Sequence, residues 1–112
     1  MVDISTWKAA DAALTVVTCP EEVDPASARG VGEALAAAVQ PGSRALIADM
    51  THTTFCDSSA IRMLAQLNWL ARENGTEFRL VAPVPAVRRV LQLTGLIPMI
   101  PVYATVTEAL TT

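Results

Sequence analysis

A short apolar segment in the middle of the chain limits what the protein can fold into. Residues 44–50 read Arg-Ala-Leu-Ile-Ala-Asp-Met, so four consecutive positions are apolar. A strand that is apolar at consecutive positions, rather than at alternate ones, is buried on both faces, as in a parallel or mixed sheet covered by helices. This segment therefore predicts an α/β fold in which helices lie over the faces of a sheet.

Helical patterns flank this strand on both sides. Asp24-Pro25 has the form of an N-cap followed by proline at the first helical position, and Pro41-Gly42 ends the pattern that begins there. Thr105 and Glu108 have the spacing of a capping box. We expect four helices, which cover residues 24–40, 58–74, 84–94 and 105–110.

The strand signals complete the predicted architecture. Asp3 to Lys8 and Leu14 to Cys19 read as the two strands of a hairpin. Further strands are expected at residues 77–81 and 99–103, and Pro101 within the last one indicates a sheet edge. We therefore expect residues 1–112 to form one α/β domain, a single mixed sheet of about five strands covered by about four helices.

Composition and charge narrow the functional classes. The chain is 52% hydrophobic with a net charge of −3, whereas a surface for nucleic acid or anionic lipid needs clustered Lys and Arg. The longest apolar runs fall well short of 18 residues, and the N-terminus lacks a basic region followed by an apolar one. We expect a cytoplasmic protein that does not insert into a membrane and whose partner is another protein.

The metal-ligating residue types are few. Cys19 and Cys56 lie in apolar segments without CxxC spacing, which favours buried reduced thiols over a disulfide or a zinc site. His52 is the only histidine and sits in a polar loop without a second ligand at metal spacing. No metal and no cofactor are therefore expected.

A polar junction precedes the helix expected at residue 58. Asp57, Ser58 and Ser59 directly precede an amphipathic pattern, and Asp and Ser accept hydrogen bonds from the free amides of a first helical turn. A serine at a helix N-terminus is also exposed at the tip, where unpaired amides tolerate an added phosphate. The junction therefore indicates a helix cap first, and a modification site is compatible with that role.

Several segments resemble those of one known family. The residues of this resemblance are Ile47-Ala48-Asp49-Met50, then Thr54-Phe55-Cys56-Asp57-Ser58-Ser59, with Glu22-Val23-Asp24, Gly75 and residues 87–96 as further matches. Together they resemble STAS domains, in particular the small bacterial anti-sigma factor antagonists. The resemblance extends over essentially the whole chain.

The resemblance implies a phosphorylation switch without catalysis by the chain itself. In such proteins the serine after the Asp, here Ser58, is phosphorylated by an anti-sigma factor that is an ATP-dependent serine kinase. The unmodified protein binds that kinase and frees the sigma factor. The phosphorylated form dissociates from the kinase, and a PP2C-type phosphatase removes the phosphate. An acidic residue matching Asp24 lies beside the phosphorylated serine. We expect the partner-binding residues to be Asp24, Asp57, Ser58, Ser59 and Arg62.

Two residues depart from the family pattern. Family members commonly carry Gly at the position of Ala60 and a small residue at that of Arg62. Arg62 stands four residues after Ser58, so it either pairs with a phosphate on that serine or is a solvated arginine on the helix face. Trp69, further along the same helical stripe, either packs over a helix edge or anchors a partner.

Three functions remain open from the sequence. The first is the phosphorylation-switched antagonist, expected to be a monomer. The second is a STAS module that binds a partner without being switched, for example a transporter-associated or scaffold subunit of a signalling complex. The third, a small hydrolase that uses Ser58 or Ser59 with His52, is poorly supported because there is no GxSxG motif.

Overall fold

A five-stranded sheet forms the centre of the computed structural model, which describes residues 3–9 and 12–111, with side chains from Leu14 onward. The strands β1 and β2 form an antiparallel hairpin, and all the other pairings in this sheet are parallel. The predicted mixed sheet is confirmed, and the apolar segment 44–50 is its middle strand. The order across the sheet is β1 (Asp3–Ala9), β2 (Ala12–Thr18), β4 (Ser43–Asp49), β6 (Glu77–Val81) and β7 (Val102–Tyr103).

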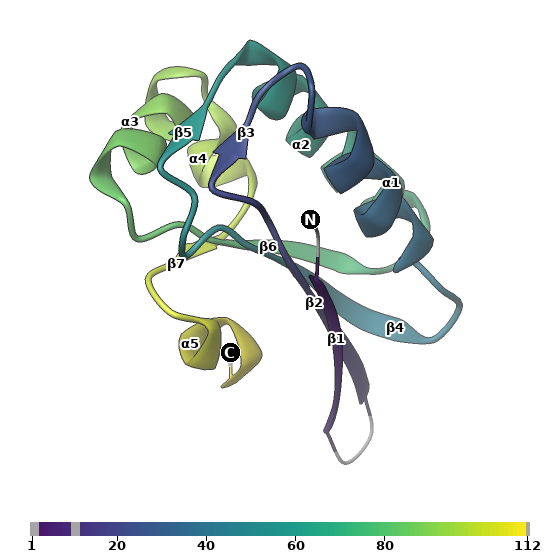
Figure 1. Ribbon diagram of the computed structural model, residues 1–112. Coiled ribbons are helices and arrows are strands. Elements are labelled where there is room, and N and C mark those ends of the chain that lie inside the picture. The colour runs from purple at the N-terminus through teal and green to yellow at the C-terminus, as the bar shows by residue number, and fades with distance from the viewer. Residues whose placement is uncertain (1–2, 10–11, 112) are drawn as a thin grey trace.

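Helices cover both faces of this sheet. The first four pack over one face, and α5 lies alone on the other (Figure 1). Because β4 lies between these two layers, its inward and outward side chains are both buried, which accounts for its consecutive apolar residues. The described helices are α1 (Ala28–Ala37), α2 (Ser58–Glu73), α3 (Pro85–Leu93), α4 (Leu96–Met99) and α5 (Val106–Thr111).

The core is divided by the sheet into a large and a small cluster. Leu46 and Phe78 lie in the large cluster with Leu64 of α2, and all three are at most 1% exposed. Ile47 lies in the small cluster with Ala109 of α5. Successive residues of β4 thus enter different clusters, as the alternation of side chains along a strand requires.

A second, two-stranded sheet was not predicted. β3 (Glu22–Val23) and β5 (Phe55–Cys56) pair in parallel, with Glu22 opposite Phe55 and Val23 opposite Cys56. We expected residues before Ser58 to form only a connector, because two residues are too few to give a strand pattern. This small sheet holds the segment before α1 against the segment before α2.

Both predicted ends of the first helix and the predicted start of the last strand are wrong. Helix α1 ends at Ala37 and not at residue 40. Helix α1 begins at Ala28 with Ser27 as N-cap, whereas the sequence pattern favoured Asp24-Pro25. Asp24 does accept backbone hydrogen bonds, but it caps the turn that precedes the helix. At the other end of the chain, Met99 belongs to α4, and the strand expected over 99–103 is only Val102–Tyr103. Its position at the sheet edge is confirmed.

The packing of α2 against the sheet leads to a stability prediction. Leu64 is fully buried, so Leu64→Ala should lower the free energy of unfolding by about 3 kcal/mol, within the range of roughly 2 to 5 kcal/mol for buried leucines. Leu93, at the end of α3, is 75% exposed, so Leu93→Ala should change the free energy of unfolding by less than about 0.5 kcal/mol. Urea denaturation measures both. Equal effects of the two substitutions would contradict this packing.

Candidate functional site

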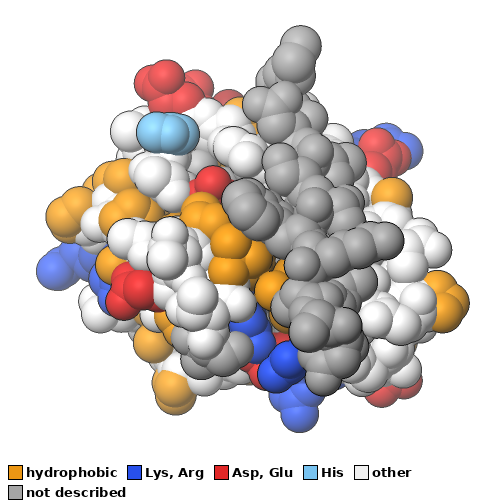
Figure 2. All heavy atoms as spheres, turned by 90° about the horizontal axis from the view of Figure 1, so that it is seen from below, with side chains coloured by type: hydrophobic (Ala, Val, Ile, Leu, Met, Phe, Trp, Pro, Cys, Tyr) orange, Lys and Arg blue, Asp and Glu red, His pale blue; other side chains and the backbone are white. Residues whose placement is uncertain are grey.

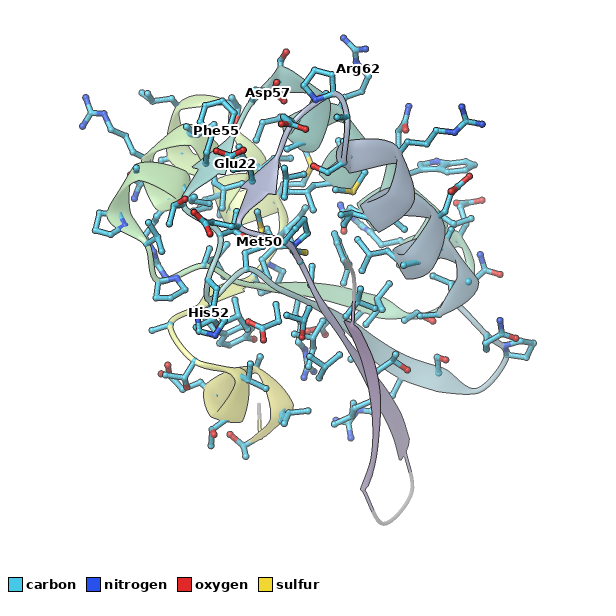
Figure 3. All side chains as sticks on the ribbon, viewed as in Figure 1. Glu22, Met50, His52, Phe55, Asp57 and Arg62 are labelled. Atoms are coloured by element: carbon cyan, nitrogen blue, oxygen red, sulfur yellow. The ribbon has the colours of Figure 1, made fainter. Side chains whose placement is uncertain are left out.

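The candidate site forms where the two short parallel strands end. Asp24 follows β3 and Asp57 follows β5, and the register places these two aspartates at neighbouring strand ends. The backbone N–H of Asp57 donates to the carbonyl of Val23 at 3.3 Å, and that of Thr54 donates to Glu21 at 2.8 Å. Figure 3 shows Glu22, Phe55 and Asp57 at one end of the molecule. The small sheet therefore brings together segments that are far apart in the sequence.

Asp57 is the N-cap of α2, as predicted. Its carboxylate accepts from the backbone N–H of Ser59 at 2.9 Å and of Ala60 at 3.4 Å, and it also accepts from the Ser59 hydroxyl. The hydroxyl bond of Ser59, together with these amides, lowers the pKa of Asp57 below its ordinary value of 3.8. The expectation of free amides beside Ser58 is therefore wrong for these two, because Asp57 already occupies them.

The two serines at the start of α2 have different environments. Ser58 is exposed, and among the residues that the structure describes its hydroxyl has no hydrogen-bond partner. Ser59 is half-buried, and its hydroxyl donates to Asp57. Only Ser58 is therefore presented to solvent with a hydroxyl available to another protein.

Asp24 is held by local hydrogen bonds of its own. Its carboxylate accepts from the backbone N–H groups of Ala26 and Ser27 at 3.0 and 3.1 Å. The Ser27 hydroxyl in turn accepts from the Asp24 N–H at 3.1 Å and donates to the carbonyl of Glu22 at 2.8 Å. Asp24 thus caps the turn before α1 as Asp57 caps the first turn of α2, and both contribute negative charge to the same end of the molecule.

A groove of about 510 Å³ between α1 and α2 lies beside this junction. Ser59 and Arg62 line it from α2, and Arg29 and Glu33 line it from α1. A Cβ atom at Gly32 would come within 3.0 Å of Met63 Cγ, so glycine there lets the two helices approach closely. No sequence pattern pointed to this groove, because helical periodicity does not reveal which helices pair.

Arg62 and Trp69 lie on the outward side of α2. Arg62 is exposed, and Trp69 is 65% exposed beside a shallow hollow lined by Ala65 and Leu70. The exposure of Trp69 leaves it available as a partner-binding anchor. Phe55 of β5 is a further exposed aromatic residue, at 49%, which no sequence pattern marked as a partner-binding residue.

His52 lies apart from the serines. It is exposed in the turn after β4, and the pale blue imidazole of this single histidine is visible at the surface in Figure 2. Figure 3 shows it separated from Asp57 and Arg62 by the length of the β5 segment. The structure therefore does not bring together the serine–histidine pair of the hydrolase hypothesis. Within residues 3–9 and 12–111 no group of His, Cys, Asp and Glu could hold a metal ion.

Both cysteines are free and buried, as predicted. Burial, and then the charge of Asp49, raise the pKa of Cys19 to about 12. Burial, and then the charge of Asp57, also raise the pKa of Cys56. Because the thiolate is the reactive form, neither thiol is activated in the folded protein.

Comparison with known proteins identifies the family. The family model for the STAS domain matches residues 8–109, and the chain therefore belongs to the STAS domain family. No curated protein matches the chain. Across the described residues no helix has the length and apolar character needed to cross a membrane.

Three solved structures illustrate what the chain is similar to. An anti-sigma factor antagonist from Mycobacterium paratuberculosis is 28% identical with a TM-score of 0.79, over 99% of this chain and 92% of that one. Phosphorylated SpoIIAA of Bacillus, called a cell fate determinant, is 21% identical with a TM-score of 0.68, over 96% of both chains. The murine anion transporter Slc26a9 is 21% identical with a TM-score of 0.75, over 87% of this chain and 17% of the transporter. The last two likenesses show the fold alone.

The buried thiols lead to a reactivity prediction. In the native protein at pH 7.5 neither Cys19 nor Cys56 should be alkylated by iodoacetamide within an hour, because burial keeps both thiols protonated and covered. Unfolding in urea should expose both, and intact mass measures the number of additions. Rapid alkylation of the native protein would contradict the described environment.

The capping role of Asp57 leads to a stability prediction. Asp57→Ala should lower the urea midpoint at pH 7, and Asp57→Asn should recover most of the loss, because Asn is also a good N-cap. The pKa of Asp57 in the folded state is depressed, so the ionised carboxylate stabilises the fold above the ordinary pKa of 3.8. This stabilisation is lost as the pH falls through the folded-state pKa. The advantage of wild type over Asp57→Asn should therefore shrink below pH 4. A constant difference down to pH 2.5 would refute the shift.

Proposed function

We propose that this protein is an anti-sigma factor antagonist controlled by phosphorylation of Ser58. Its unmodified form binds an anti-sigma factor that is a serine kinase and thereby releases the sigma factor. Phosphorylation turns this binding off, and a PP2C-type phosphatase restores it. The observation that carries the proposal is the contrast at the start of α2, where the Ser58 hydroxyl is exposed and unbonded within the described structure while Asp57 and Ser59 are bonded to each other.

The similarities described above support this choice. The Mycobacterium relative is an anti-sigma factor antagonist that the chain matches along almost its whole length. SpoIIAA, which shares the fold, exists in a phosphorylated form. A STAS domain with an accessible serine at this junction is consistent with the same kind of control.

The proposed partner surface is built around the small sheet. It consists of Asp24, Asp57, Ser58, Ser59 and Arg62, which the pairing of β3 with β5 and the first turn of α2 place at one end of the molecule. Two of these residues are acidic and half-buried. A partner that presents basic side chains would complement them, with a gain mainly in association rate and specificity.

The chemistry of phosphorylation explains how binding would end. A phosphate adds a charge of about −1.5 to −2 next to the Asp57 carboxylate. The added charge is favourable to the helix at its N-terminus, by roughly 0.3 to 1 kcal/mol, so α2 should stay folded. A change from mostly bound to mostly free requires about 5 kcal/mol of differential affinity. A dianion that is desolvated and repelled within the interface is sufficient for this.

A second function is kept open by the transporter similarity. The fold of this chain also occurs within Slc26a9, so a STAS module that binds its partner without a switch remains the alternative. The two functions differ in whether a kinase modifies Ser58.

The test uses the anti-sigma factor kinase encoded nearest to this protein in the genome. The protein is incubated with that kinase and ATP, and intact mass is compared for wild type, Ser58→Ala and Ser59→Ala. We expect wild type and Ser59→Ala to gain one phosphoryl group and Ser58→Ala to gain none. Ser59→Ala serves as the matched control because it removes the neighbouring hydroxyl. If no kinase of this class modifies wild type, the unswitched module is the better account.

A further inference from the structure

A phosphate on Ser58 would find the amides of Ser59, Ala60 and Ile61 already occupied. The Asp57 carboxylate accepts from the N–H groups of Ser59 and Ala60, and the first backbone bond of the helix joins Ile61 N–H to the Asp57 carbonyl. These groups would otherwise be natural donors to an anion at a helix N-terminus. The phosphate would instead stand beside a carboxylate and needs a cation from elsewhere.

Arg62 is placed to supply that cation. It stands one helical turn after Ser58 on the same outward side of α2, and Figure 3 shows it near the end of the helix at which Asp57 lies. Arg62 is exposed and, among the residues that the structure describes, makes no ion pair or side-chain hydrogen bond. Residues at this spacing are neighbours on a helix surface, and a negative group that precedes a positive one by four residues is the favourable order.

The other arginine of the groove is already engaged. Arg29 Nε lies 3.7 Å from Glu33 Oε2 on α1, although both side chains are well exposed. Asp57, Asp24, Glu21 and Glu22 add carboxylates at this end. Arg62 is therefore the cation of the groove with no carboxylate of its own among the described residues.

We propose that Arg62 binds the phosphate of phosphorylated Ser58 and is thereby withdrawn from the groove between α1 and α2. Phosphorylation then changes the partner surface in two ways, because it adds a dianion and removes the free arginine from the groove rim. A guanidinium binds a phosphate through two parallel N–H donors, which fixes its direction. The regulatory meaning of this pair rests on the proposed function, whereas the pair itself does not.

The test places phosphoserine at position 58 during translation, so that no kinase is needed. The second ionisation of the phosphate is followed by ³¹P NMR between pH 4 and 8 in the wild-type background, in Arg62→Gln and in Arg29→Gln. The pair should lower this pKa, and Arg62→Gln should raise it by roughly 0.2 to 0.4 units, as expected for an i,i+4 ion pair. Arg29→Gln, the matched control, should leave it unchanged.

Two further measurements sharpen the test. The difference between wild type and Arg62→Gln should shrink in 1 M NaCl, since salt screens exposed charges. The NMR signal of Arg62 Nε should move on phosphorylation, and that of Arg29 should not. An unchanged phosphate pKa in Arg62→Gln, or a shift of the same size in Arg29→Gln, would overturn the proposal. The proposed function is contradicted by a different result, namely that no kinase phosphorylates Ser58.

Discussion

The candidate site depends on the pairing of two very short strands. β3 and β5 contribute two residues each, yet their parallel register holds the segment that begins α1 against the segment that begins α2. Asp24 and Asp57 follow these strands, and each caps the turn after it. Because the Asp57 carboxylate accepts from the hydroxyl and from the N–H of Ser59, the hydroxyl that remains free at this junction is that of Ser58. Backbone pairing and one carboxylate thus decide which serine a partner meets.

The sequence predicted the larger architecture well. The consecutive apolar residues of β4 indicated a strand covered on both faces, and α5 proves to lie opposite the other four helices (Figure 1). Asp57 as a cap was also readable, because capping chemistry is local. The start of α1 could not be read from the sequence, because Asp24 and Ser27 are both good capping residues. Only the geometry shows that Ser27 begins the helix.

The sequence named the residues of the candidate site but not their environment. The resemblance to STAS domains pointed to Ser58, and the family match confirms the membership. The groove beside Arg62 requires knowledge of how α1 packs on α2, which no single-helix pattern contains. The occupation of the Ser59 and Ala60 amides by Asp57 depends on a side-chain rotamer, so the sequence suggested free amides where the structure has bonded ones.

The central claim is that the charge state of Ser58 controls a protein interface. It is tested most directly by isothermal titration of the anti-sigma factor kinase encoded beside this protein, with unmodified protein and with protein that carries phosphoserine at position 58. The account predicts several-thousandfold weaker binding of the phosphorylated form, about 5 kcal/mol, without loss of helical structure. Equal affinity of the two forms would contradict it.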